Sequence, residues 1–164
     1  LETSALGAVG YDGDLLTGGG VRVTIDTRWH FGGSVDYLAE RRSEDLAGYG
    51  QVSVTSSTAA LAAHLGWELG AIRLRAAAGV RAGTATIAGD SDSTGVVASS
   101  VSGLIASPMA RLDFGVAVLG PLTVTTSVEA GVHLVPVRGT ADGMRQAAVD
   151  GSWVRGQLAA GWRW

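Results

Sequence analysis

The sequence predicts an all-β protein, an eight-stranded antiparallel up-and-down transmembrane β-barrel that forms one domain over residues 1–164. Three observations support this prediction. Short stretches alternate apolar and polar residues and are bounded by turn residues. The connections between them alternate between long and short. Arginines and acids share one face with small residues, as the narrow inside of such a barrel requires.

The composition excludes several other classes of protein. Hydrophobic residues make up 46% of the chain, but no run reaches the roughly 18 consecutive apolar residues that a transmembrane helix needs. All 12 basic residues are arginine, the net charge is −3, and no basic stripe points to nucleic acid. The absence of cysteine excludes disulfides, thiolate metal sites and thiol nucleophiles.

The first two strands are expected at residues 3–11 and 21–29. The second has the clearest alternation, because Val21, Val23 and Ile25 form one face. Its other face carries Arg22, Thr24, Asp26 and Arg28. This strand therefore has an apolar face and a charged face.

The third and fourth strands are expected at residues 31–40 and 59–68. In the third, Val35 and Tyr37 oppose a polar face, and Leu38 breaks the pattern. That polar face carries Ser34, Asp36 and Glu40. In the fourth, Leu61, Leu65 and Trp67 oppose small residues, His64 and Glu68.

The last four strands are expected at residues 72–81, 111–118, 122–133 and 154–164. Their charged faces carry Arg73, Arg75, Arg81, Arg111, Asp113, Glu129, Arg155 and Arg163. Short turns near residues 30, 69 and 120 alternate with long connections near residues 12–20, 42–56, 88–99 and 136–151. Outer-membrane barrels have long external loops and short periplasmic turns.

Two further patterns place the charged face inside the barrel. Small residues stand among the charges and leave room for arginine side chains; they are Gly32, Ala60, Ala62, Gly66, Ala77, Gly79, Gly115, Ala117, Ala159 and Gly161. Aromatic residues gather at strand ends, where membrane interfaces favour them. One rim has Trp29, Phe31, Trp67, Trp162 and Trp164, and the other has Tyr11, Tyr37 and Trp153.

The chain ends in Trp162-Arg163-Trp164, preceded by the polar Gln157. This segment resembles the terminal signal by which bacterial outer-membrane proteins are recognised for barrel assembly, with Ala159 where that signal usually has glycine. The strand number and loop rhythm resemble the small barrels of the outer membrane protein A and X type. The resemblance implies a bacterial outer-membrane location, with outer-membrane lipid and other envelope proteins as partners.

Eight arginines and seven acids are expected to point inward, Glu2 included, and near neutrality in a narrow lumen predicts a network of ion pairs that plugs the barrel. The named members are Arg22, Asp26, Arg28, Asp36, Glu40, Glu68, Arg73, Arg75, Arg81, Arg111, Asp113, Glu129, Arg155 and Arg163. Acidic loops at residues 12–14 and 90–92 offer oxygen ligands, but their spacing forms no calcium loop. We therefore expect no metal and no cofactor.

The sequence shows no catalytic constellation. Glu129 and His133 share a strand face but lie roughly 13 Å apart, so a triad would have to form across strands. Lipid A deacylases carry a His and a Ser two residues apart, and His133-Leu134-Val135 departs from that pattern. We predict a non-enzymatic scaffold or anchor that contacts another envelope component through its loops or outer wall. The alternatives are a lipid-modifying hydrolase, a small ion-conducting pore and, at the level of fold, a soluble ligand-binding barrel.

Overall fold

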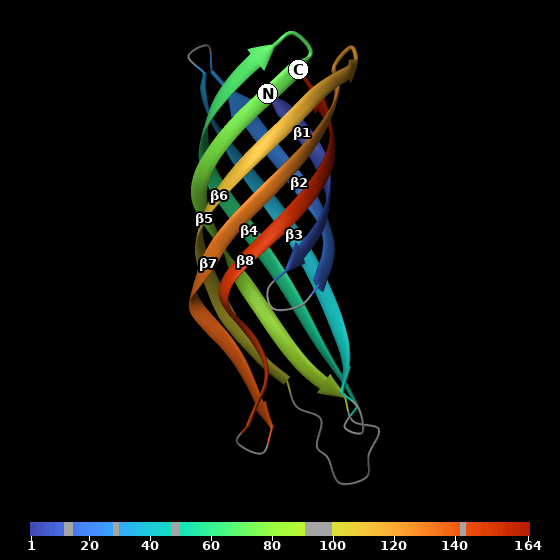
Figure 1. Ribbon diagram of the computed structural model, residues 1–164, viewed down its shortest axis with the longest axis vertical. Coiled ribbons are helices and arrows are strands. Elements are labelled where there is room, and N and C mark those ends of the chain that lie inside the picture. The colour runs from blue at the N-terminus through green and yellow to red at the C-terminus, as the bar shows by residue number, and fades with distance from the viewer. Residues whose placement is uncertain (12–14, 28–29, 47–49, 91–99, 142–143) are drawn as a thin grey trace.

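The structure is a computed structural model that describes residues 1–11, 15–27, 30–46, 50–90, 100–141 and 144–164. Eight antiparallel strands follow one another in sequence order, and β1 pairs with β8 to close the barrel (Figure 1). The strands are β1 (Glu2–Tyr11), β2 (Leu15–Asp26), β3 (Phe31–Leu46), β4 (Gly50–Leu69), β5 (Ile72–Asp90), β6 (Ser100–Leu119), β7 (Leu122–Ala141) and β8 (Met144–Arg163). The predicted fold class is confirmed.

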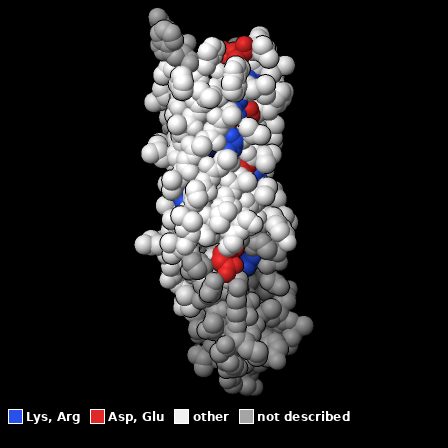
Figure 2. Space-filling view, turned by 60° about the vertical axis from the view of Figure 1, so that its left-hand side comes forward, with Lys and Arg blue, Asp and Glu red and all other residues white. Residues whose placement is uncertain are grey.

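The two faces of the sheet have the polarity of a membrane barrel. Large apolar side chains such as Ile25, Leu61 and Leu158 are exposed on the outside, whereas Arg111 and Glu129 are buried. A soluble barrel has the opposite arrangement, because it buries its apolar face. Figure 2 shows a wall made mainly of uncharged residues. The soluble-barrel alternative is therefore wrong. In the part of the chain that is described, no helix is long and apolar enough to cross a membrane.

Tight turns and both chain termini lie at one end of the barrel (Figure 1). The β4–β5 turn contains Gly70 with a φ of 65°, and the β6–β7 turn contains Gly120 with a φ of 52°. Glycine adopts this left-handed conformation without the steric cost that a Cβ imposes. The predicted short turns near residues 69 and 120 are confirmed, and this end corresponds to the periplasmic side of an outer-membrane barrel.

The predicted long loops were too long. β2 already begins at Leu15, β3 and β4 leave only residues 47–49 between them, β5 continues to Asp90, and β7 and β8 leave only residues 142–143. The extended parts of these strands have apolar residues on the inner face and many Ser, Thr and Ala on the outer face. The contrast between faces that identifies a strand in the sequence is therefore lost there.

Those inner apolar residues form a second layer inside the barrel, toward the loop end. We call it the apolar layer; it consists of Val54, Ala85, Ile87, Ile105, Val137 and Val149. All six are buried, with exposed fractions of 6% or less. The lumen is thus charged over most of its length and apolar near the loops.

The barrel wall is lower at β1 and β2 than elsewhere. β1 pairs with β8 only as far as Tyr11 with Val154, and β2 pairs with β3 only as far as Thr17 with Arg41. Beyond this level the strands divide into a four-stranded sheet of β3–β6 and a hairpin of β7 and β8, because the β6–β7 pairing ends at Met109 with Gly131 (Figure 1). Within the described ranges, no strand lies along the outer edges of β3 residues 43–46 and β8 residues 144–149. We call the space between these edges the side notch.

β8 also bends beside the side notch. The β7–β8 register shifts between His133 and Val137, and Gly151 has a φ of 80°. Pro136 lies in the shifted segment, and a proline cannot donate a ladder hydrogen bond. Irregularities of this kind turn a strand and change its direction. The bend separates the regular barrel from its extension.

Candidate functional site

The charged lumen begins with a group of ion pairs close to the short turns. Glu2 accepts hydrogen bonds from Arg73 at 2.6 Å and from Arg75 at 3.0 Å. Arg75 also donates to Asp26 at 2.7 Å, and His64 Nε2 lies 2.9 Å from the same carboxylate. These residues come from β1, β2, β4 and β5, so the group connects opposite sides of the barrel.

A central group lies deeper in the lumen. The Asp36 carboxylate forms ion pairs with the guanidinium groups of Arg81 at 2.7 Å and Arg111 at 3.1 Å. The Glu129 carboxylate forms ion pairs with the guanidinium groups of Arg81 at 2.8 Å and Arg155 at 3.0 Å. Both carboxylates are almost completely buried, and each is shared by more than one guanidinium. Arginine suits this role because its planar fork can bridge two carboxylates at once.

Two further ion pairs extend the central group. Arg155 pairs with Glu40, which also accepts a hydrogen bond from Ser56 at 3.4 Å. Arg22 lies 3.4 Å from Asp113 and donates to the side-chain oxygen of Gln157. The central group therefore reaches from β2 and β3 to β8.

Each group is balanced in charge among the described residues. The group near the turns contains Arg73, Arg75 and Arg163 with Glu2, Asp26 and Glu68. The central group contains Arg22, Arg81, Arg111 and Arg155 with Asp36, Glu40, Asp113 and Glu129. An unpaired charge in this environment would cost several kcal/mol, and the pairing avoids that cost.

The structure corrects the predicted depth of two residues. Glu68 and Arg163 were expected to point inward, but they lie at the short-turn mouth with side chains 49% and 45% exposed and pair there at 3.0 Å. They border an open recess of about 360 Å³ that is also lined by Asp26, His30 and Arg73. Residues at the end of a strand reach past the sheet, so alternation no longer fixes their burial. Arg28 lies outside the described residues.

The predicted assembly residues occupy two different environments. Gln157 is buried in the lumen, and Trp162 and Trp164 are exposed on the outside near the chain end. Phe31 and Trp67 are also exposed on the outer wall, whereas Trp29 lies outside the described residues. The assembly role of the terminal segment stays a prediction.

Small residues on the inner face make room for large partners. A Cβ on Gly32 would collide with the ring of His64, and one on Gly131 would collide with the ring of Trp153. Ala60, Ala62, Ala77 and Ala159 are buried as expected. Ala117 lines a recess at the short-turn mouth together with Arg73 and Thr123, and it is exposed there because it lies close to the end of β6.

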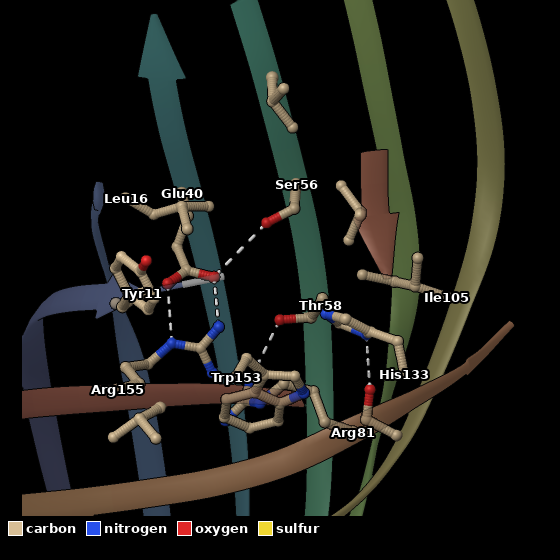
Figure 3. A pocket seen from close by; sticks show the side chains of 15 residues that line it. Tyr11, Leu16, Glu40, Ser56, Thr58, Arg81, Ile105, His133, Trp153 and Arg155 are labelled. Carbon is tan, nitrogen blue, oxygen red and sulfur yellow. Dashed lines mark hydrogen bonds and ion pairs between the residues drawn. The ribbon is translucent and has the colours of Figure 1, made fainter. Parts of the chain in front are cut away.

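A small cavity lies where the charged lumen meets the apolar layer (Figure 3). Ser107 Oγ lies 2.8 Å from His133 Nδ1, and the His133 ring packs beside Trp153 at 6.1 Å between centroids. Arg155 stacks over Trp153 at 4.7 Å, a cation–π contact. Tyr11, at the border of the side notch, also lines this cavity. Its volume of about 30 Å³ suits a water molecule or two.

Trp153 was predicted to lie at the rim, and this prediction was wrong. Its side chain is 4% exposed and points into the lumen. It continues the inner face of Arg155 and Gln157 by one step, but the expected strand began only at residue 154 and left it out. The indole Nε1 is buried and has no hydrogen-bond partner among the residues that the structure describes. An indole nitrogen needs such a partner when buried, which fits a bound water in the cavity.

The Ser107–His133 contact was missed in the sequence, although a signal for it exists. Ser107 and His133 lie the same number of residues before and after Gly120 in the β6–β7 turn, so a regular hairpin places them opposite each other. The observed register agrees with this count, since Met109 pairs with Gly131. The sequence prediction compared residues along one strand only. Among the described residues, no cluster of His, Asp and Glu could hold a metal ion. The acidic segments at residues 12–14 and 90–92 lie outside the described side chains.

Known structures of low sequence identity have the same fold. No protein-family model matches the chain. No curated protein matches it either. A major outer membrane protein from Thermus thermophilus superposes with a TM-score of 0.69 at 14% identity, covering 99% of both chains.

Two further solved structures agree. Neisserial surface protein A gives a TM-score of 0.60 at 10% identity, covering 99% of this chain and 95% of that chain. The Yersinia pestis attachment invasion locus protein, solved with the heparin analogue sucrose octasulfate, gives 0.56 at 14% identity with the same coverage. Their shared strand number and closure confirm the predicted resemblance at the level of fold. The chain is an eight-stranded β-barrel of the small outer-membrane type.

Proposed function

We propose that this barrel is a closed, non-enzymatic scaffold that stands in the outer membrane and contacts another envelope component. The observation that carries the proposal is the charge-balanced network in the lumen. Four arginines and four acids of the central group fill the space between the strands, and the cavity beside them has a volume of only about 30 Å³. Among the described residues, a cavity of this size beside the ion pairs has room for water but not for a hydrated ion.

The apolar layer supports the same proposal. It closes the loop end of the lumen with aliphatic side chains, and hydrophobic constrictions exclude water and ions. An ion would therefore have to pass both a layer of ion pairs and a dry layer.

Single-channel recording in planar lipid bilayers tests the closed lumen. We expect no conductance steps from the purified, folded barrel in 1 M KCl on the order of 100 mV, the range in which membrane potentials act on charges. The positive control is a double variant, Arg111→Ala with Ile105→Ser, which opens space in both layers. Regular conductance steps from the unaltered barrel would contradict a closed scaffold and favour the pore.

The Ser107–His133 contact favours a second candidate, a hydrolase of outer-membrane lipid. A serine within 2.8 Å of a histidine has the geometry of a nucleophile and its base. The adjoining cavity, however, has no room for an acyl chain in this conformation. Incubation with radiolabelled lipid A tests this candidate: release of fatty acid that is lost in both Ser107→Ala and His133→Ala would replace the scaffold with the hydrolase.

A further inference from the structure

The open recess at the short-turn mouth has the size of a small ligand site. Its volume of about 360 Å³ lies within the range of about 300–1,000 Å³ that is usual for small-molecule pockets. Side chains of β2, β5 and β8 line it, together with Glu68 of β4 and His30 in the turn before β3. The ion pairs of the central group lie deeper in the lumen. A periplasmic ligand can therefore enter the recess without crossing the barrel.

Two arginines at this recess share a single carboxylate oxygen. Glu68 Oε1 lies 3.0 Å from Arg73 Nε, 2.9 Å from Arg73 Nη2 and 3.0 Å from Arg163 Nη2. We call Glu68, Arg73 and Arg163 the mouth clamp. Charge-assisted contacts of this kind are those by which arginine recognises a carboxylate. The mouth clamp thus already holds a carboxylate, which the chain itself supplies.

The Glu68 carboxylate is in a position to be displaced. Glu68 and Arg163 are both exposed at this end, so solvent screens their ion pair. The mouth clamp also lines the second recess, beside Ala117 and Thr123, and Glu68 therefore has open space into which it can turn. A ligand carboxylate in its place would carry the same single charge. The ion pairs near the turns would then stay balanced.

Asp26, the other acid of the recess, adds little repulsion toward such a ligand. Its carboxylate pairs with Arg75 at 2.7 Å and lies 2.9 Å from His64 Nε2. The negative charge of Asp26 is thus compensated from the lumen side. The guanidinium groups of the mouth clamp therefore dominate the field that an incoming carboxylate meets.

The wall of the recess also contains a strained residue. His30 has a φ of 64°, and in the described part of the chain it is the one non-glycine residue with a left-handed backbone. Its carbonyl oxygen accepts a hydrogen bond from the Gly66 N–H at 2.7 Å, and its Nδ1 lies 3.0 Å from the Gly66 carbonyl oxygen. These two contacts fix the imidazole in the wall. Strained residues held in this way concentrate at ligand sites.

We propose that the mouth clamp binds the free carboxylate of a peptide chain end presented from the periplasm, and that this carboxylate displaces Glu68. The inference rests on the proposed scaffold function and names one contact surface and the chemistry of the partner that fits it. Arg73 and Arg163 hold the carboxylate, and the recess holds the last residues of the peptide, since its volume exceeds what a carboxylate alone would fill. A phosphate dianion would bring a second negative charge that the mouth clamp does not balance.

An NMR titration of the barrel in lipid nanodiscs tests the proposal. The probe is acetyl-dialanine with a free carboxylate, and the amide signals of Gly66 and Arg163 report binding. We expect saturable binding that is about fivefold or more weaker in Arg163→Gln, because a charge-assisted hydrogen bond is lost. Glu68→Gln should bind about two- to fivefold more tightly, since the ligand no longer competes with an exposed ion pair. Arg41→Gln removes the same charge from the outer wall toward the loop end and should leave the affinity unchanged.

His30→Gly separates a role in binding from a role in folding. Glycine adopts the left-handed conformation without strain, which offsets the loss of the imidazole contact. The midpoint of urea unfolding should therefore stay nearly unchanged, while acetyl-dialanine binds more weakly because part of the wall is missing. Full affinity in this variant would contradict the place of His30 in the site.

Two further kinds of probe test the chemistry of the ligand. Acetyl-dialanine amide lacks the charge and should not bind, and acetate and inorganic phosphate should bind more weakly than the peptide. Equal binding of the amide, of acetate or of phosphate would overturn the proposal, and so would unchanged affinity in Arg163→Gln and Glu68→Gln. If Arg163→Gln does not fold, the exposed Glu68→Gln decides alone. Conductance in bilayers would refute the closed scaffold, whereas a silent barrel that binds no peptide would refute only the mouth clamp.

Discussion

Glu129 is the carboxylate on which the central group of the lumen depends most. It is fully buried and pairs with Arg81 and Arg155, and Arg111 lies 3.8 Å away. Its removal would leave Arg81 and Arg155 with one carboxylate partner fewer in a buried site that contains little water. Glu68 also pairs with arginine, but at the exposed mouth, where solvent screens the interaction.

Glu129→Ala should lower the free energy of unfolding by about 3–5 kcal/mol, the usual cost of breaking a buried ion pair from one side. Glu68→Ala should cost about 0–1 kcal/mol, as exposed pairs do. Urea unfolding in detergent micelles, followed by tryptophan fluorescence, measures both. Equal effects of the two substitutions would show that the lumen is far more hydrated than its burial indicates.

Gly131 and Gly156 provide a second matched comparison. A Cβ on Gly131 would collide with the Trp153 ring, whereas Gly156 faces outward with its nearest neighbour 3.8 Å away. Gly131→Val should therefore cost about 1–3 kcal/mol, the typical penalty of overpacking, and should shift the tryptophan emission. Gly156→Val should leave both quantities nearly unchanged. An identical response of the two variants would contradict the inward position of Trp153.

At this scale, charged residues were the most predictable part of the site. Alternation with apolar neighbours identified the face of Arg22, Arg81 and Glu129. It also identified the face of Asp36, although Leu38 interrupts the pattern in that strand. The sequence could not predict which arginine pairs with which acid. Arg75 pairs with Glu2 and Asp26, 73 and 49 residues away, and only the closed barrel defines that neighbourhood.

Among the elements, β8 combines three environments in one strand. Its last residues reach the chain end with outward tryptophans, its middle carries Arg155 and Gln157 inside the lumen, and its first residues border the side notch. Its hydrogen bonding changes along its length accordingly. Residues opposite both β1 and β7 have two neighbouring strands, and those before Val154 have one among the described residues.

The Ala148 amide should exchange with deuterium much faster than the Ala160 amide of the same strand. Ala160 lies between Ala5 of β1 and Val124 of β7, whereas the Ala148 N–H faces the notch. Exchange requires opening of the hydrogen bond that protects an amide. NMR of the barrel in nanodiscs resolves the two signals, and slow exchange at Ala148 would mean that another segment already covers this edge.

Strand ends were the least predictable feature at the scale of elements. The segments 82–90 and 100–108 belong to β5 and β6, but there Ile87 and Ile105 point inward and Thr84 points outward. The interior is charged in one half of the barrel and apolar in the other. The polarity of the inner face therefore reverses partway along each long strand. A single rule for which face is inside therefore ends each strand too early.

For the whole molecule, burial of the ion pairs determines how stability responds to salt. Screening acts strongly on exposed charges and weakly on buried ones. The central group is buried, so raising NaCl from 0.05 to 1 M should change the free energy of unfolding by less than about 1 kcal/mol, the contribution of exposed pairs such as Glu68 with Arg163. Urea unfolding at both salt concentrations measures this, and a loss of several kcal/mol would imply a lumen open to ions.

The placement of the lumen charges also bears on how the barrel reaches its final form. β5 contributes Arg75 and Arg81, yet their carboxylates come from β1, β2, β3 and β7, none of which neighbours β5 in the sheet. A partly rolled sheet, or one closed with a strand too few or a shifted register, would leave these charges unneutralised. The ion pairs are therefore complete only in the correctly closed eight-stranded barrel, and they stabilise that form relative to partly closed or misregistered ones.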